Sequence, residues 1–510
     1  MSALAALPIA VILVLMIGLG WSAARAGALG LVAALVIAWA AFGLGARVMP
    51  ELGAAAAAGG ALGEAVFLAL TILWIIFPAL CIHELQVRTG SIDVLRVAMT
   101  RIAGDARILA LLVAWFFGLF IEGAAGFGTS VALAAPFLVS AGFGRVAAVS
   151  MALIGHAIGV SFGAVGTPVV PQAAVSGLSP LAIAGATANY HLLIGWMMPL
   201  AVMFLATRAQ AATPASRVAP APWGWTFVAA ACFLVPYYLI ARLIGPELPT
   251  LAGALVGGLL FVGALRMARR RSGAEADATR AADLLRAAAP YLLLIALVVC
   301  TRMIGPLQER LRAVEIAWTY ASFGGSMQIL YHPGTMLLAS FLLGALVQRV
   351  PAVTLREAIG AVLRRLLPVT VALAAMLGLS RVMVHAGMID ALAAAAAAAA
   401  AGTWPALWPV LAPAIGLLGT FVTGSATASN ILFTEFQVAT AERLGLSVLG
   451  LTAAQGFGAA IGNIICPHNI VAASATVQLV GREGEVLRRT LLPALACALA
   501  GGFLALWLYA

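Results

Sequence analysis

Three long stretches of the sequence contain no charged residue, namely residues 146–207, 391–434 and 444–481. Each exceeds the roughly 20 apolar residues with which one helix crosses a hydrocarbon core, so each must hold several segments within a membrane. The stretches are also rich in Gly, Pro, Ser, Thr and Asn, which interrupt helices and expose their backbone groups. Broken backbone at membrane depth is tolerated only where protein or a water-filled cavity surrounds it. We therefore expect a buried cavity there.

The composition agrees with a membrane protein, because 64% of the 510 residues are hydrophobic and 9% are charged, against roughly a quarter charged in soluble domains. The length accommodates about 12–14 crossings. The predicted fold is an all-α polytopic membrane protein with about 12–14 transmembrane helices and no large soluble domain. The net charge of +10 is distributed over loops, which excludes a nucleic-acid module. Five isolated cysteines indicate neither a disulfide framework nor a metal site.

Arginine clusters indicate which loops face the cytoplasm. Residues 84–107, 266–286, 349–365 and 482–489 carry these clusters, and positive loops lie inside. The predicted organisation is a first membrane half over residues 1–265, a cytoplasmic linker at 266–287 and a second half over 288–510. The apolar run at the N-terminus is interpreted as a retained first helix that begins outside, and the segment 308–331 is predicted to be external.

Two interrupted stretches resemble each other at an offset of roughly 300 residues. The first is a hairpin near residues 120–142, followed by the break at 163–168. The second is a hairpin near 421–442, followed at a similar interval by the break at 462–469. The likeness is consistent with an internal repeat, although so many small residues can also match by chance.

The topology predicts that the two stretches run in opposite directions. The helix at about 108–120 starts from a cytoplasmic cluster, whereas one crossing separates the helix at about 404–421 from its cluster. Opposite directions are the mark of two inverted repeats, each with a re-entrant hairpin and a broken helix. The argument fails if residues 388–402 cross the membrane by themselves.

A helix that stops in mid-membrane exposes N–H groups and a partial positive charge at its N-terminus. Glycine permits close approach of an anion, and hydroxyl or amide side chains add donors. The alternative is small-residue helix packing. The candidate ligands of an anion are Gly126, Gly128, Thr129, Ser130, Thr167, Thr423, Ser425, Thr427, Ser429, Asn430, Asn463, His468 and Asn469.

The candidate proton-binding residues are Glu122, His156 and Asp390. Glu122 is the only ionisable residue between Arg107 and Arg145, and an intramembrane carboxylate is by default a functional candidate. Alternatively, Glu122 only ties the hairpin together and His156 is a satisfied core histidine. Asp390 and Arg381 are flanked by apolar sequence and could simply mark a helix end.

At these residues the sequence resembles the lactate permease family of bacterial carriers of lactate and glycolate. The segment Phe-Gly-Leu-Phe-Ile-Glu-Gly-Ala-Ala-Gly-Phe-Gly at 117–128 carries most of this resemblance. It continues at 89–90, 105–108, 244–249, 387–388, 423–430 and 480–484, which covers almost the whole chain in order. The resemblance implies a proton-coupled monocarboxylate symporter of the inner membrane and places Glu122 and residues 126–130 at its site.

Two departures from the family pattern occur together. Ala426 stands where an acidic residue is expected, and Asn463 stands where a lysine is expected. Removing both partners of a buried ion pair can be nearly neutral, whereas removing one is costly. We therefore predict that Ala426 and Asn463 face each other. The departure leaves a different small organic anion, such as a sulfonate, with altered ion coupling as an alternative.

The sequence thus indicates a transporter whose partners are a small organic anion, protons and the lipid bilayer. It implies no cofactor, and its oligomeric state stays open. A passive anion channel is a further alternative. An enzyme is disfavoured, since the sequence contains no metalloprotease motif, no nucleophile beside a base and no phosphate-binding loop.

Overall fold

The computed structural model describes residues 1–15, 19, 21, 23–94, 103, 105–126, 128–211, 222–270, 281–401, 407–479 and 482–509. Within the predicted linker at 266–287, residues 271–280 lie outside these ranges. The elements before it are α1 (Ser2–Leu13), α2 (Ala23–Ile37), η2 (Ala38–Phe42), α3 (Gly53–Arg88), α5 (Ala106–Ala110), η3 (Leu111–Phe117), α6 (Gly118–Ala124), α7 (Thr129–Ser140), α8 (Arg145–His156), η4 (Ala157–Phe162), α9 (Gly163–Gly166), α10 (Val169–Ser176), α11 (Pro180–Ile194), α12 (Met197–Ala211), α13 (Trp223–Leu243) and α14 (Pro249–Arg270).

The elements after the linker include one short sheet. They are α15 (Ala281–Met303), α16 (Gly305–Arg312), β1 (Ile316–Tyr320), β2 (Phe323–Met327), α17 (Pro333–Val347), α18 (Ala352–His385), α19 (Met388–Ala401), α20 (Trp408–Thr423), α21 (Ala426–Leu444), α22 (Val448–Gly462), α23 (Pro467–Thr476) and α24 (Glu483–Tyr509). The strands pair antiparallel, with Trp318 opposite Gly325. This hairpin departs from the all-α prediction. It lies within the segment 308–331, which was predicted only to be external.

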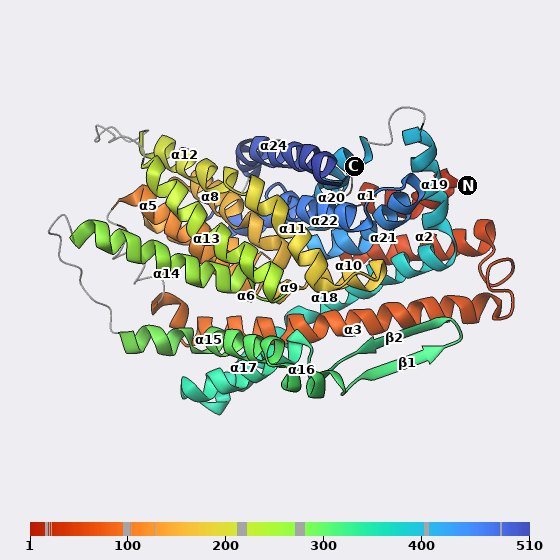
Figure 1. Ribbon diagram of the computed structural model, residues 1–510, viewed down its shortest axis with the longest axis horizontal. Coiled ribbons are helices and arrows are strands. Elements are labelled where there is room, and N and C mark those ends of the chain that lie inside the picture. Colours follow the sequence, from red (N-terminus) through yellow and green to blue (C-terminus); the bar gives the residue numbers. More distant parts are fainter. Residues whose placement is uncertain are drawn as a thin grey trace.

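The molecule is a polytopic helical membrane protein. Within the described ranges, ten helices are long and apolar enough to cross a membrane, and several shorter apolar helices accompany them. Most of the long helices run along the horizontal axis of Figure 1. The total is compatible with the predicted 12–14 segments only if some of the shorter helices also cross.

Two groups of helices pack around separate hydrophobic clusters. In one group, α18 packs against α2 and α3. In the other, α20 packs against α22 and α24, while α11 packs against α13 and α22. Both groups therefore combine helices from before and after the linker. This mixing brings the two interrupted stretches into contact.

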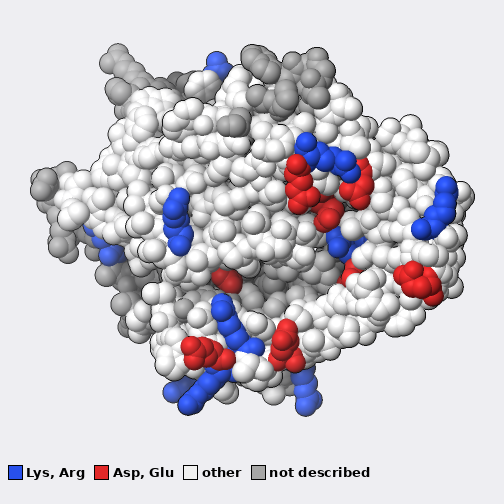
Figure 2. Space-filling model, turned by 45° about the vertical axis from the view of Figure 1, so that its right-hand side comes forward, with Lys and Arg blue, Asp and Glu red and all other residues white. Residues whose placement is uncertain are grey.

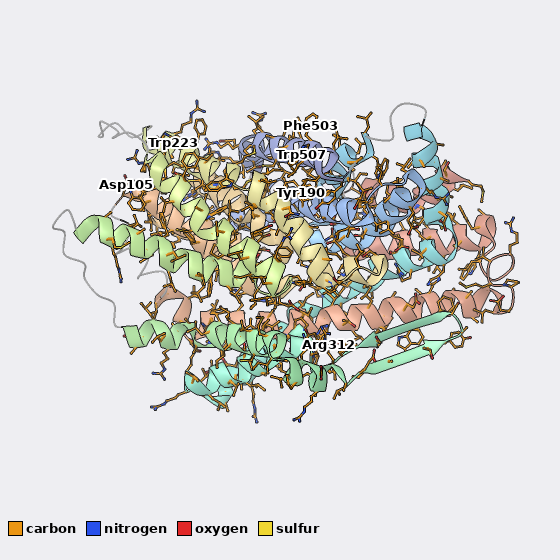
Figure 3. All side chains as sticks on the ribbon, viewed as in Figure 1. Asp105, Tyr190, Trp223, Arg312, Phe503 and Trp507 are labelled. Carbon is orange, nitrogen blue, oxygen red and sulfur yellow. The ribbon has the colours of Figure 1, made fainter. Side chains whose placement is uncertain are left out.

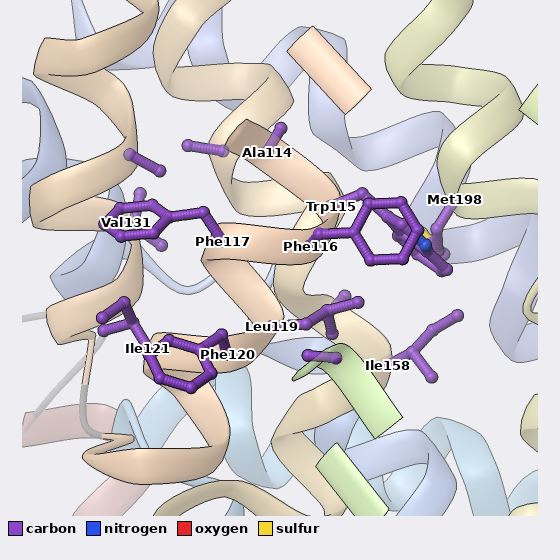
Figure 4. Packing of buried hydrophobic residues seen from close by; sticks show 14 of the residues in the cluster. Ala114, Trp115, Phe116, Phe117, Leu119, Phe120, Ile121, Val131, Ile158 and Met198 are labelled. Atoms are coloured by element: carbon purple, nitrogen blue, oxygen red, sulfur yellow. The ribbon is translucent and has the colours of Figure 1, made fainter. Parts of the chain in front are cut away.

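The interior and the perimeter differ as expected for a protein in lipid. Trp115 and Tyr190 are fully buried, and the aromatic residues of η3 and α6 fan out into a packed core (Figure 4). On α24, by contrast, Phe503 and Trp507 are 58% and 77% exposed and point outward at the upper edge of Figure 3. An apolar perimeter of this kind suits hydrocarbon.

Candidate functional site

The first interrupted stretch is a helix–turn–helix formed by α6 and α7. Helix α6 ends at Ala124, and the turn places Gly126 and Gly128 at φ 59° and 75°. Both glycines occupy the left-handed region, which costs residues with a Cβ roughly 1–2 kcal/mol. A Cβ on Gly126 would also lie 3.0 Å from Cβ of Ala164. Glycine at these positions lets the turn approach the broken helix that follows.

Glu122 is held at the end of α6 by side chains from α7 and α8. Ser130 Oγ donates to Glu122 Oε2 at 2.8 Å, and His156 Nε2 lies 3.9 Å from the same oxygen. Glu122 is 3% exposed and His156 is fully buried. A Cβ on Gly163 would lie 2.6 Å from Glu122 Oε1. Oε2 of the carboxylate therefore faces polar side chains, whereas Oε1 lies against the backbone at Gly163.

The broken helix of the first stretch loses its α geometry immediately after His156. A 3₁₀ segment, η4, follows, and Ala164 and Val165 then adopt φ 43° and 55°. Left-handed geometry is unusual for a β-branched residue and costs of order 1–3 kcal/mol per residue. Thr167 Oγ1 donates to the carbonyl of Ala164 and stabilises this turn. The interruption predicted at residues 163–168 is confirmed.

The second stretch repeats the same order of elements without a carboxylate at its turn. Helix α20 ends at Thr423, Gly424 adopts φ 77°, and Ser425 Oγ accepts from Ala428 N–H to cap α21. Downstream, α22 ends at Gly462, and a turn leads into α23. The interruptions predicted near 423–430 and 462–469 are both confirmed.

The two stretches meet at one small cavity. Its lining comprises Glu122, Gly126, Val160, Gly163, Ala164, Thr167 and Pro168 from the first stretch, and Gly424, Ser425, Ala426, Thr427 and Asn463 from the second. Its open space, about 30 Å³, holds one or two water molecules. Ala426 and Asn463, which the sequence predicts to face each other, line the same cavity.

A buried chain of polar side chains continues from Glu122 across the boundary between the stretches. His156 Nδ1 donates to the carbonyl of Ala152 at 2.9 Å, and Nε2 lies 3.1 Å from Asn463 Oδ1. Asn469 Nδ2 donates to the same Asn463 oxygen at 2.7 Å. Both ring nitrogens of His156 therefore face oxygen atoms, and the imidazole lies between the carboxylate of Glu122 and the amide of Asn463.

Several other predicted ligands stabilise the stretches rather than line the cavity. Asn430 Nδ2 donates to the carbonyl of Pro168 at 2.9 Å and so links α21 to the first stretch. Thr129, Thr423 and Ser429 donate to the carbonyls of Gly126, Gly419 and Gly416, respectively. Gly128 lies against Asn469, since a Cβ there would be 3.1 Å from its Oδ1. The side chains of Thr129, Thr423, Ser429 and Asn430 therefore form hydrogen bonds with backbone carbonyls.

Two predicted residues are not part of the cavity as described. Asp390 lies apart from it, and the side chain of His468 is not described. The Asp390 side chain is 68% exposed and forms an ion pair of 3.2 Å with Arg443. His468 belongs to the first turn of α23, but its side chain lies outside the described residues. Val160 packs with Ala426 but was not predicted, because an apolar residue in an apolar stretch gives no signal.

The chemistry of the cavity suits a small polar anion better than a metal. In the described part of the chain, no cluster of three or more His, Cys, Asp or Glu side chains could hold a metal ion. The cavity instead presents the N-terminus of α21 with two hydroxyls, the amide of Asn463 and one carboxylate. Helix N-termini and hydroxyls are donors for oxyanions.

Comparisons with solved structures return transporters at low similarity. The YdaH transporter of Alcanivorax borkumensis aligns with a TM-score of 0.47 and 18% identity, covering 88% of this chain and 86% of that one. MtrF of Neisseria gonorrhoeae, from a class of antimetabolite efflux pumps, aligns with a TM-score of 0.44 and 16% identity, covering 85% and 80%.

Sequence relatives are more informative. The L-lactate permease of Bacillus subtilis is 28% identical over 84% of this chain and 83% of its own length. The glycolate permease GlcA of Escherichia coli is 29% identical over 94% and 90%. The sequence model described as L-lactate permease matches residues 2–323 and 311–509. The chain therefore belongs to the L-lactate permease family and is a multi-pass membrane transporter rather than an enzyme.

Proposed function

We propose that the protein imports a small 2-hydroxymonocarboxylate, such as lactate or glycolate, by proton symport across the bacterial inner membrane. The observation that carries this proposal is the convergence of the two interrupted stretches on one buried cavity that contains Glu122. The relatives named lactate and glycolate permeases support the substrate class.

In this proposal the second stretch binds the substrate carboxylate. The N-terminus of α21 carries a partial positive charge, and Ser425 and Thr427 line the cavity beside it. The amide of Asn463 also lines the cavity and serves the 2-hydroxyl group. This arrangement provides donors for the anion without a full positive charge.

The first stretch supplies the proton coupling. A substrate carboxylate next to an ionised Glu122 would be repelled in a buried site. Binding of the anion together with one proton adds no net charge to the site. Uptake of substrate and uptake of a proton are therefore favoured together.

The small size of the cavity implies that substrate entry requires the surrounding helices to move. In Figure 1, α19 lies at the right-hand end and runs across the direction of α3, so it does not extend alongside the long helices as a further crossing. This placement supports opposite directions for α6 and α20, and hence an inverted repeat in which one group of helices moves against the other.

Transport by purified protein in proteoliposomes tests the proposal. We expect L-lactate to accumulate when an inward proton gradient is imposed and not when only a sodium gradient is imposed. Glu122→Gln should abolish accumulation but retain exchange of external for internal lactate, because exchange needs no net proton movement. Glu485→Gln, a surface carboxylate paired with Arg482, is the matched control.

Transport measured in the same proteoliposomes distinguishes two alternatives from proton symport. A passive channel would equilibrate lactate without accumulating it against a gradient. A carrier of another anion is favoured by the absence of the acid and base at Ala426 and Asn463. Such a carrier would accumulate a competing short acid or sulfonate in preference to lactate.

A further inference from the structure

A second cavity, larger than the first, lies on the other side of α10. Its volume is about 350 Å³, and its polar lining includes Glu64, Thr71, Ser326 and Arg381. Small-molecule sites typically occupy about 300–1,000 Å³. The cavity lies between α3 with the β-hairpin and α10 with α18. In the view of Figure 2 the surface is hollowed between the lower layer and the rest of the molecule, and acidic and basic side chains border the hollow.

Helix α10 forms a wall shared by the two cavities. Thr167 and Pro168, at its start, line the central cavity, and Val170, Ala174 and Val175 line the second one. The left-handed residues Ala164 and Val165 precede this helix. This short segment therefore separates the two cavities.

The two carboxylates nearest the second cavity already have partners. Glu64 accepts from Gly324 N–H at 3.1 Å and lies 2.7 Å from His385 Nε2. Glu435 lies 3.5 Å from Arg381 Nη2. The next charged neighbours, Asp390 and Arg443, pair with each other at 3.2 Å. These acidic groups are therefore not free to bind a cation.

The guanidinium of Arg381 is the poorly satisfied group in this cavity. It has five N–H donors, its contact with Glu435 is longer than the roughly 2.7–2.9 Å typical of charged pairs, and its buried Nε has no hydrogen-bond partner among the described residues. A buried, unsatisfied donor is costly. A planar oxyanion would satisfy two of these donors at once.

We propose that this cavity is a second carboxylate site, in which Arg381 binds the substrate before it reaches the central cavity and Glu435 competes for the same guanidinium. The proposal rests on the function proposed above. Because Glu435 can re-form its ion pair with Arg381, the anion is bound only transiently and is released towards α10. The predicted external position of the β-hairpin places this site on the side from which substrate enters.

The test is the kinetics of L-lactate uptake in proteoliposomes under an imposed proton gradient. Arg381→Gln should raise KM at least about tenfold, as expected for loss of a charged hydrogen-bonding group, and leave kcat within about twofold. Arg381→Lys should fall between the wild type and Arg381→Gln, because lysine keeps the charge and loses the planar fork.

Glu435→Gln should act in the opposite sense and so separates binding from folding. Without its competitor, Arg381 should hold lactate more tightly, which lowers KM several-fold and also lowers kcat by slowing release. Arg364→Gln and Glu442→Gln, exposed positions on the same two helices, should leave both constants unchanged. If the ion pair were purely structural, Arg381→Gln and Glu435→Gln would impair lactate uptake alike.

The double variant Arg381→Gln/Glu435→Gln covers the case in which Arg381→Gln does not fold, because removal of both charges of a buried pair is far better tolerated than removal of one. It should keep the raised KM. A wild-type KM in folded Arg381→Gln or in the double variant would overturn the second site while the proposed function stands. If the wild type accumulates no short carboxylate, both proposals fall together.

Discussion

The two interrupted stretches have the same order of elements but different chemistry at their turns. The first carries Glu122, bonded to Ser130 and facing His156, whereas the corresponding turn of the second is neutral and is capped by Ser425. The proposed function gives them different tasks. In that proposal the charged stretch holds the proton, and the neutral stretch offers helix-end donors to the anion.

The largest expected effect follows from placing a charge in the neutral stretch. Ala426→Asp introduces a carboxylate at a position that is 3% exposed, near Glu122 and without a cation. We expect a destabilisation of about 4 kcal/mol, measured by thermal unfolding in detergent, and loss of lactate uptake. Ala426→Asn, which has nearly the same shape without the charge, is the control.

Asn463→Lys should rescue Ala426→Asp if the two positions face each other across the cavity. The interaction free energy from the double-mutant cycle should be clearly non-zero, since residues in contact couple by about 0.5–3 kcal/mol. Additive effects of the two substitutions would contradict the prediction that Ala426 and Asn463 face each other across the cavity.

The next effect comes from disturbing the charged stretch without changing its charge. Gly163→Ala would place a methyl group 2.6 Å from Glu122 Oε1 and should displace the carboxylate. We expect a cost of about 2 kcal/mol and loss of proton-driven accumulation. Gly263→Ala, where a Cβ would meet no heavy atom within 4 Å, should leave uptake intact. Normal accumulation by Gly163→Ala would show that the position of Glu122 does not matter.

A smaller effect is expected from the link between the stretches. Asn430→Ala removes the donor to the carbonyl of Pro168 and should cost about 1.5 kcal/mol. It should also raise KM for lactate, because α10 is no longer tied to α21. Uptake kinetics and unfolding are measured on the same preparation. A change in stability with an unaltered KM would limit Asn430 to a structural role.

The smallest effect concerns the cap of the neutral stretch. Ser425→Ala removes the acceptor for Ala428 N–H and should cost about 1 kcal/mol, whereas Ser425→Thr should restore most of it. Ser425 also lines the cavity, so the alanine variant should bind lactate more weakly than the threonine variant. Equal affinities would remove the hydroxyl from the binding site.

Much of the architecture was predictable because the hydrocarbon core imposes simple rules. Charge-free stretches rich in Gly and Pro predicted the interruptions, and Glu122 was identified because it is isolated among apolar residues. The β-hairpin was not predicted, since its stability comes from packing on α3, where Phe67 meets Gly325 and Glu64 accepts from Gly324 N–H.

Individual site residues were harder to predict. Residue type does not reveal whether a hydroxyl faces a cavity. Thr423 instead donates to the carbonyl of Gly419 in the preceding turn of α20, and Ser429 of α21 donates to the carbonyl of Gly416 in α20. The sequence pointed to Arg381 but not to its neighbours Glu64 and Glu435, because the three residues belong to helices that are distant in sequence. Only the packing of α3, α18 and α21 brings these charges together.

The most direct measurement tests whether both stretches enclose one binding site. Val160→Cys and Ala426→Cys, each in a background lacking the five native cysteines, report on the first and the second stretch, respectively. We predict that L-lactate slows alkylation of both thiols by a maleimide with the same half-maximal concentration, which should match KM for uptake. Protection of only one thiol, or of neither, in protein that still transports lactate would contradict the account.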